Sequence, residues 1–235
     1  MGKGKDDFEG LILVNKPAGI TSHDVVDIVR RRLGIKKVGH AGTLDPLAEG
    51  LLVILVGRYT KFFKKFVEFK KEYVGILKLG ETTTTGDSEG DILNKVSYHN
   101  INKKDIINAF KNFVGEIEQI PPMVSAKRIN GKRLYILARK GIVIERKPRK
   151  INIYKLKVLD ITLPLVKFYV QCSKGTYIRK LAEDIGEELR CGAHIIKIQR
   201  KAIGPFRLDE AVRLEEVNKK NIIRTFFSLK DAQVY

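Results

Sequence analysis

The sequence is poor in cysteine and has no long apolar run, and both shortages narrow the class of protein. Its two cysteines, Cys172 and Cys191, are too few for a disulfide scaffold and indicate a reducing compartment. Cys191 and His194 resemble half of a zinc site, but no second pair has suitable spacing, so we expect no metal. No stretch approaches membrane-spanning length, and the first residues lack the apolar core of a signal peptide. We therefore expect a soluble, cytoplasmic protein without a membrane partner.

Acidic residues are scarce relative to basic ones. The chain has 45 Lys and Arg against 27 Asp and Glu, a formal net charge of +18. Such an excess repels itself unless a polyanion is close, so the composition predicts nucleic acid as the first partner. A Lys-rich surface that serves solubility or heat tolerance would give the same charge. With 43% apolar and 31% charged residues, the chain has the balance of a folded protein.

The chain also lacks repeats and low-complexity linkers, so one domain over residues 1–235 is the simpler organisation. Apolar patterns and turn residues predict strands at 10–14, 51–56, 71–79, 151–161, 165–173 and 193–203, and helices from a Ser22 cap to Gly34, at 102–114 and at 177–189. Residues 38–50 are too rich in Gly and Pro for a regular element. Residues 116–150 are the most basic part, with a predicted turn at 130–131 and a short helix at 134–138. Strands and helices mix without a regular βαβ order, which predicts an α+β fold with a mixed, mostly antiparallel central sheet and flanking helices.

One candidate for chemistry is Asp45, which lies in the segment HAGTLDPLAEG of residues 40–50. Its glycines allow the backbone to approach a ligand closely, and Pro46 fixes the φ angle that follows the carboxylate. Asp-Pro in such a loop is ordinarily only a turn. The combination of His40, Asp45 and Glu49 beside a predicted core strand favours a functional site instead.

A second candidate is the segment CSKGTYIR of residues 172–179, where a strand gives way to a helix. Tyr177 and Arg179 fall in the first helical turn. An arginine is unfavourable there because the helix dipole prefers acidic groups at this end, so Arg179 indicates a carboxylate or phosphate partner. The alternative is a surface arginine that extends into solvent.

Both segments resemble signature segments of the TruB family of tRNA pseudouridine synthases. Further segments resemble the family in the same order along the chain, and the resemblance covers roughly residues 10–210. The seven segments are KPAGITS at 16–22, GHAGTLDPLAEG at 39–50, IPPMVSAK at 120–127, NGKRLY at 130–135, ARKG at 138–141, SKGTYIR at 173–179 and CGAH at 191–194. The resemblance implies the pseudouridine synthase fold and an isomerase that needs no cofactor.

The resemblance also implies a reaction. The family breaks the C1′–N1 bond of the uridine at position 55 in the T-arm of tRNA, turns the base and rejoins it through C5, after the base has been flipped out of the stack. The resemblance implies that Asp45 is the covalent catalyst, which attacks either C1′ or the base ring. Arg179 would pair with Asp45 and keep it ionised. Tyr73 would stack on the flipped base, the alternative being a strand tyrosine packed in the sheet.

Substrate-binding roles follow from the same resemblance. His40 would enter the T-loop and fill the space that the flipped base leaves. Tyr177 would line the pocket, and Ile198 would close it where the family usually has Leu. Asp87 would be a carboxylate near the pocket, unless it only forms a turn. The remaining two residues, Lys16 and Lys61, would contact phosphate.

Besides Ile198, the sequence departs from the family in two further places. The usual Thr-Asp-Thr before Asp87 reads Thr-Thr-Thr at 83–85, which puts in doubt any ion pair of the missing Asp. The sequence ends at Tyr235, and we expect it to lack the small C-terminal RNA-binding (PUA-like) domain of many relatives. We therefore expect a single catalytic domain. A basic insertion at about 116–150 would bind the T-arm in this domain. We expect a monomer. Two other hypotheses are an RNA chaperone that opens the T-arm, and a guide-RNA-dependent relative, which would generally carry the additional C-terminal domain.

Overall fold

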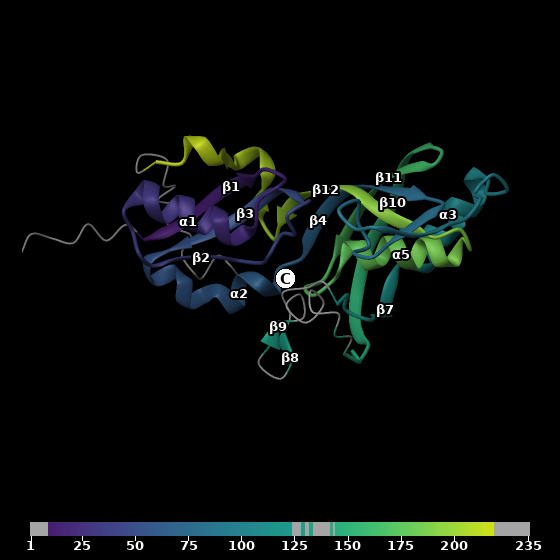
Figure 1. Cartoon of the computed structure of the whole chain (residues 1–235). Coiled ribbons are helices and arrows are strands. Elements are labelled where there is room, and N and C mark those ends of the chain that lie inside the picture. Colours follow the sequence, from purple (N-terminus) through teal and green to yellow (C-terminus); the bar gives the residue numbers. More distant parts are fainter. Residues whose placement is uncertain (1–8, 124–127, 130–131, 134–141, 143, 219–235) are drawn as a thin grey trace, which may run out of the picture. The chain divides into compact units, whose positions relative to one another are not determined.

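The computed structural model describes residues 9–123, 128–129, 132–133, 142 and 144–218 of the 235. The chain forms two compact units (Figure 1). Unit 1 combines residues 1–72 with 199–235, and unit 2 is the stretch Tyr73–Ile198 between them. Strand β12 (Ala193–Ile203) begins in unit 2 and ends in unit 1.

Unit 1 is a sheet that carries helices. Its elements are β1 (Gly10–Lys16), α1 (Ser22–Leu33), β2 (Val38–His40), β3 (Glu49–Val56), the 3-10 helix η1 (Gly57–Phe62), α2 (Phe63–Glu68), the end of β12, β13 (Phe206–Arg207), η2 (Leu208–Glu210), β14 (Val212–Arg213) and η3 (Leu214–Glu216). The strand order is β14-β1-β3-β12, with β2 on β3 and β13 on β12. β1 and β3 are antiparallel from the pair Gly10–Val56 to the pair Lys16–Gly50, whereas β12 runs parallel to β3.

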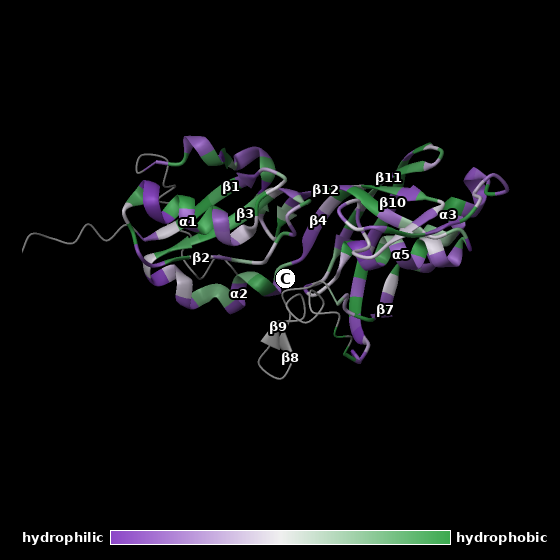
Figure 2. Cartoon of the chain, viewed as in Figure 1, coloured by the Kyte–Doolittle hydropathy of each residue, from purple (hydrophilic) through white to green (hydrophobic). Residues whose placement is uncertain are grey.

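Both faces of the unit 1 sheet are buried, which explains the continuous apolar run LLVILV in β3. Because side chains alternate along a strand, even-numbered residues such as Ile12 and Ile54 face one way and pack with Val25 and Val29 of α1. Odd-numbered residues such as Leu11 pack on the opposite side in a cluster that includes the α2 residue Phe66. β1 and β3 are accordingly among the most hydrophobic segments of the unit (Figure 2).

Unit 2 is built around a mostly antiparallel sheet of order β12-β4-β11-β10-β7. Its elements are β4 (Lys71–Leu79), β5 (Glu81–Thr83), β6 (Ile92–Lys95), α3 (Lys103–Asn112), β7 (Gly115–Gln119), β8 (Arg128–Ile129), β9 (Lys132–Arg133), β10 (Arg149–Thr162), β11 (Leu165–Cys172), α5 (Ile178–Glu188) and the start of β12. β5–β6 and β8–β9 form separate two-stranded sheets.

Close packing in unit 2 depends on one glycine and two aromatic rings. Phe110 of α3 meets Phe168 of β11 edge-on, with ring centroids 5.8 Å apart. Gly75 of β4 lies under the same Phe168 ring, and a Cβ atom there would come within 2.8 Å of it. A side chain at position 75 would therefore force the ring of Phe168 to move.

The predicted α+β fold with a mixed, mostly antiparallel sheet and flanking helices is confirmed, and the strand predictions at 71–79 and 193–203 match β4 and β12. Two local predictions were wrong. Thr21, and not Ser22, caps α1, because the Thr21 hydroxyl accepts the Asp24 N–H at 3.1 Å. Residues 38–50 contain β2 and the first residues of β3, since pairing with β3 outweighs the local Gly and Pro content.

Other predictions fall partly outside the structure. The turn at 130–131 and the helix at 134–138 lie outside the described residues, and the single-domain organisation stays a prediction. Both ends of the basic segment 116–150 are strands, because β7 and the start of β10 pair with each other. Within the described part of the chain, none of the helices has the length and apolar character that a bilayer crossing requires.

Candidate active site

Asp45 lies in the Asp45 loop, which we define as residues 41–48 between β2 and β3 of unit 1. The residue before it, Leu44, is held by Ser22, whose hydroxyl accepts the Leu44 N–H at 2.8 Å and donates to the Leu44 carbonyl at 3.0 Å. Ser22 and Leu44 are both buried, and Asp45 itself is half-buried. The backbone just before Asp45 is therefore anchored to the start of α1.

The residue after Asp45 is held as well. The Pro46 carbonyl accepts the Gly19 N–H at 2.9 Å and the Lys16 ammonium at 3.3 Å. The same ammonium donates to the carbonyls of Pro17 at 2.8 Å and Ile20 at 2.7 Å, so its three donors have acceptors. Lys16 is 0% exposed. Lys16 thus supports the loop in this structure, and its predicted phosphate contact stays a prediction.

Arg200 of β12 holds the beginning of the loop, and the sequence analysis did not single it out. Its guanidinium donates to the carbonyls of Gly42 at 3.0 Å, Thr43 at 3.3 Å and Leu51 at 2.8 Å, and the residue is 1% exposed. Gly50 permits this approach: its φ is +104°, and a Cβ atom would lie 2.4 Å from the Arg200 carbonyl oxygen. The alternation of β12 offers a signal for it, because Arg200 falls on the same face of the strand as Ile198 and Ala202, whereas Lys197 and Lys201 fall on the other.

His40 precedes the Asp45 loop at the end of β2, and its ring is neutral at physiological pH. Burial, reinforced by the positive charge of Arg200, lowers the pKa of His40 to about 4. Its Nδ1 atom is buried and has no hydrogen-bond partner among the described residues. Lys61, the other predicted RNA contact of unit 1, is exposed in η1.

In unit 2, the predicted partner of Arg179 is present as a carboxylate. Arg179 is only 5% exposed, and its Nε lies 3.5 Å from the carboxylate of Asp87, while its Nη1 donates to the Thr85 carbonyl at 2.7 Å. The alternative of a solvent-exposed arginine is therefore wrong. The predicted pairing with Asp45 would join the two units and stays a prediction.

Asp87 forms the expected turn and also meets Arg179, and its predicted place near the substrate pocket stays a prediction. Its carboxylate accepts the hydroxyl of Thr85 and the N–H of Glu89 at 3.1 Å. The turn is joined to β12, where the Ile195 N–H donates to the Gly86 carbonyl at 3.1 Å. We call this turn, residues 85–89, together with residues 177–179 the Arg179 corner.

Tyr177 is the residue before the first turn of α5, and Gln119 holds it. The Gln119 side chain accepts the Tyr177 N–H at 2.8 Å and donates to the Tyr177 carbonyl at 3.1 Å. Gln119 lies at the end of β7, is 3% exposed, and was not predicted. A buried glutamine beside a Pro-Pro pair is the only sequence signal for it. The two other predicted residues of unit 2, Tyr73 on β4 and Ile198 on β12, are both buried.

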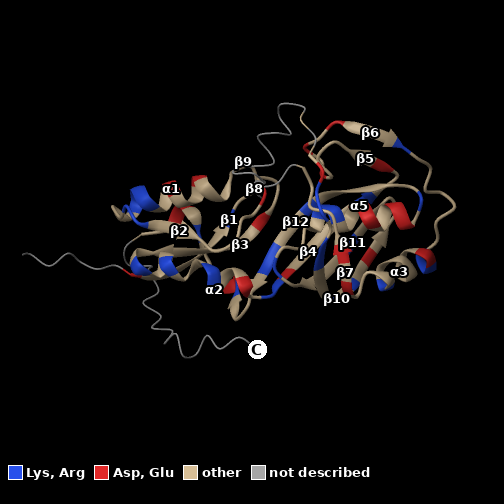
Figure 3. Cartoon of the chain, turned by 90° about the horizontal axis from the view of Figure 1, so that it is seen from below, with Lys and Arg blue, Asp and Glu red and all other residues tan. Residues whose placement is uncertain are grey.

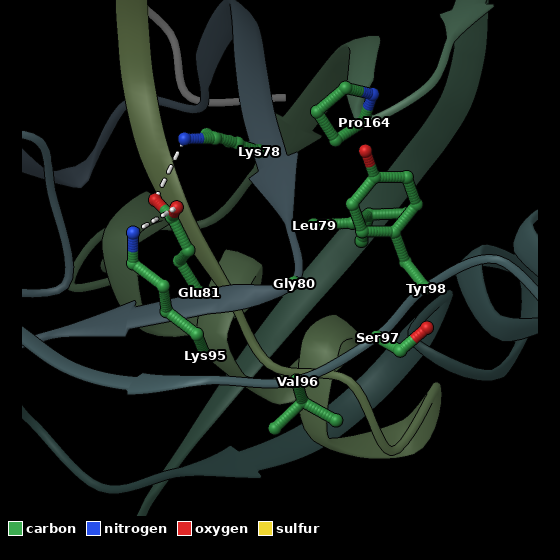
Figure 4. Close-up of a pocket in the computed structure, with 9 residues that line it drawn as sticks. All are labelled: Lys78, Leu79, Gly80, Glu81, Lys95, Val96, Ser97, Tyr98 and Pro164. Carbon is green, nitrogen blue, oxygen red and sulfur yellow. Dashed lines mark hydrogen bonds and ion pairs between the residues drawn. The ribbon is translucent and has the colours of Figure 1, made fainter.

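A separate cavity of about 500 Å³ in unit 2 contains none of the predicted site residues (Figure 4). On one side the ammonium groups of Lys78 and Lys95 lie 2.8 Å and 3.6 Å from the Glu81 carboxylate. The hydrogen bond from Lys78 lowers the pKa of Glu81. The other side carries Tyr98 and Pro164. Because the one carboxylate of this cavity is already paired with both lysines and no predicted site residue lines it, we do not place chemistry there. The described residues also contain no cluster of His, Cys, Asp or Glu that could hold a metal ion.

The fold is that of the pseudouridine synthases. The structure resembles that of a chain in a crystal structure of a Cbf5-Nop10-Gar1 complex. The TM-score is 0.70 and the sequence identity is 30%, and the match covers 97% of this chain and 57% of the other chain. The structure also resembles that of a chain in a structure of an H/ACA RNP bound to a substrate RNA containing 2'-deoxyuridine, with a TM-score of 0.67 and 28% identity over 97% of this chain and 56% of that one. The chain thus spans a little over half the length of these solved chains.

Sequence relatives narrow the assignment. Residues 30–178 match the N-terminal domain of the TruB family pseudouridylate synthases, and residues 179–226 match the tRNA pseudouridylate synthase B C-terminal domain. The chain is 50% identical to tRNA pseudouridine synthase B of Clostridium kluyveri, over 96% of this chain and 78% of the relative. It is 43% identical to that of Endomicrobium trichonymphae, over 95% of this chain and 97% of the relative. The chain belongs to the TruB family.

Proposed function

We propose that the chain is a stand-alone tRNA pseudouridine synthase that isomerises the T-loop uridine at position 55, with Asp45 as the covalent catalyst. The observation that carries this proposal is the Asp45 loop, whose residues on both sides of the carboxylate are fixed by Ser22, Lys16 and Arg200. A catalytic group gains most when it is held in its reactive geometry before the substrate arrives. Family membership supports the choice of reaction, because the relatives are named tRNA pseudouridine synthase B.

The reaction needs no atoms from outside the uridine. The C1′–N1 bond breaks, a C1′–C5 bond forms, the proton on C5 is lost and N1 gains one. The carboxylate of Asp45 forms and then releases the covalent bond to substrate, on C1′ or on the base ring. Tyr73 stacks on the flipped base, and Arg179 pairs with Asp45 and keeps it ionised. These roles extend the family resemblance to this chain.

The neutral ring of His40 supports a role in base flipping. A planar, uncharged ring can replace the stacking that the extruded base gives up, whereas a charged imidazolium would lose hydration on entering the stack. Burial and Arg200 keep this ring neutral by lowering the pKa of His40 to about 4. Binding of the T-arm as a whole draws on the +18 charge of the chain, and basic residues occur in both units (Figure 3).

The test is release of tritium from tRNA labelled at uracil C5, with the purified chain and no guide RNA. We expect Asp45→Asn to abolish release and to leave tRNA affinity nearly unchanged, because the amide keeps the shape of the side chain but is not a nucleophile. Asp209→Asn is the matched control: it makes the same change at an exposed residue of unit 1 and should retain wild-type release. Turnover in Asp45→Asn would refute the catalytic assignment. Release only after a guide RNA is added would favour the guide-dependent alternative.

A further inference from the structure

Ser22 makes two hydrogen bonds to one residue, and that residue precedes Asp45. Its single hydroxyl proton goes to the Leu44 carbonyl at 3.0 Å, and its oxygen receives the Leu44 N–H at 2.8 Å. Ser22 is 2% exposed and Leu44 is 4% exposed, so water does not replace either bond easily. Since Thr21 already caps α1, the Ser22 hydroxyl is not needed for the helix end.

This double contact restrains a backbone torsion that helps to aim Asp45. The N–H and the carbonyl of Leu44 lie on opposite sides of its Cα, so a single oxygen that holds both limits rotation about the Cα–C bond of Leu44. Rotation about that bond would swing the next peptide unit and move the Cα–Cβ bond of Asp45. Hydrogen bonds to the Pro46 carbonyl from Gly19 and Lys16 limit the compensating movement on the other side.

Ser22 is itself well anchored. It is the first residue of α1, whose buried valines pack into the core of unit 1. The helix start is fixed by a reciprocal pair of bonds, in which the Thr21 hydroxyl accepts the Asp24 N–H at 3.1 Å and the Asp24 carboxylate accepts the Thr21 N–H at 2.8 Å. A rigid support is a requirement for any residue that positions another.

We propose that Ser22 is a positioning residue for the reaction, which transmits the rigidity of α1 through Leu44 to the carboxylate of Asp45. The proposal rests on the proposed function, because it takes Asp45 as the catalyst. Ser22 does not touch the substrate in this role. Its removal therefore changes the rate of the chemical step and not the affinity for tRNA.

The experiment compares Ser22→Ala with Thr21→Ala in the full chain. For each variant, the single-turnover rate of tritium release, the Kd for tRNA and the melting temperature are measured. Ser22→Ala is expected to slow release by roughly 10- to 100-fold, as a displaced catalytic group does, with Kd changed by less than about twofold. Thr21→Ala removes the neighbouring cap and lowers the melting temperature, but leaves Leu44 untouched, so its rate should stay near the wild-type value. Ser22→Cys keeps the approximate volume with a weaker hydrogen-bonding group and should be intermediate.

Each outcome decides the matter. A wild-type rate in Ser22→Ala, or equal rate losses in Ser22→Ala and Thr21→Ala that follow stability, would overturn the proposal. If Ser22→Ala does not fold, Ser22→Cys takes its place, and a wild-type rate there would overturn it. Asp45→Asn is run alongside. Turnover in that variant refutes the proposed function, whereas its inactivity together with a fully active Ser22→Ala refutes only the positioning role.

Discussion

The Asp45 loop of unit 1 and the Arg179 corner of unit 2 are held by the same kind of hydrogen bonding and differ in the partners of their buried cations. In each, one buried side chain bonds both the N–H and the carbonyl of a single residue: Ser22 on Leu44, directly before Asp45, and Gln119 on Tyr177, two residues before Arg179. Such a bracket fixes backbone that belongs to no regular element. Asp45 therefore extends from loop backbone that is held by tertiary contacts, whereas Arg179 extends from the first turn of α5, just after a residue that is held in this way.

The buried cations of the two regions have different partners. Around the Asp45 loop, Lys16 and Arg200 donate to backbone carbonyls. In the Arg179 corner, Arg179 meets the Asp87 carboxylate as well as a carbonyl. The Arg179–Asp87 contact is thus an ion pair in which the two charges largely cancel, whereas the carbonyls to which Arg200 donates are neutral. The positive charge of Arg200 contributes to the low pKa of His40.

The largest expected effect breaks the ion pair of the Arg179 corner. Arg179→Met leaves Asp87 buried without its cation, so we expect a loss of about 3–5 kcal/mol in the free energy of unfolding. Urea denaturation measures it. Lys180→Met is the matched control on the same helix. The partners of Lys180 are Glu183 and Asp184, and all three are partly exposed, so its loss should cost only about 0–1 kcal/mol. Equal losses in the two variants would show that the Arg179 pair contributes no more than a surface pair.

The sequence predicted the framework of both regions but not their supports. A continuous apolar run was enough to predict β3, an apolar pattern to predict β4 and a glycine stop to predict the end of α1, because these features depend on neighbours in the chain. The carboxylate partner of Arg179 was predictable from its place at a helix start. That partner, Asp87, is 92 positions away in the sequence and is brought close only by the bridge to β12.

Ser22, Gln119 and Arg200 illustrate why the rest could not be predicted. Ser22 fits a helix cap by its sequence context, and only the structure shows that Thr21 takes that role while Ser22 bonds to Leu44. Arg200 and Gln119 bind backbone carbonyls and N–H groups, and every residue has these. A side chain that recognises backbone leaves no complementary residue type in the sequence to reveal it.

A smaller effect tests whether the bracket of unit 2 acts as that of unit 1. Gln119→Leu keeps the approximate size but leaves the N–H and the carbonyl of Tyr177 without this partner, at a cost of about 1–3 kcal/mol in stability. Because Tyr177 is predicted to line the substrate pocket, we expect a raised KM with kcat reduced less than about threefold. Steady-state tritium release gives both constants. A fall in kcat at constant KM would place Gln119 with Ser22, as support for the chemical step.

The smallest effect at neutral pH concerns His40 and sharpens the difference in charge. Its pKa is about 4 in the folded chain and ordinarily 6.5, so between these values the unfolded chain binds the additional proton. Stability therefore rises with pH from about 4 to 6.5 and is lost as the pH falls through this window. His40→Gln removes the proton uptake, so the variant should lose less stability on acidification, which its melting temperature reports. The acid-induced loss in the free energy of unfolding should be smaller than that of the wild type by about 1–2 kcal/mol at pH 5, with almost no difference at pH 7. Glu183 and Asp184 of unit 2 have pKa values raised by burial and contribute the opposite slope in both proteins, so only the difference between wild type and variant is informative. Parallel melting curves across this pH range would mean that neither burial nor Arg200 disfavours the charged imidazolium.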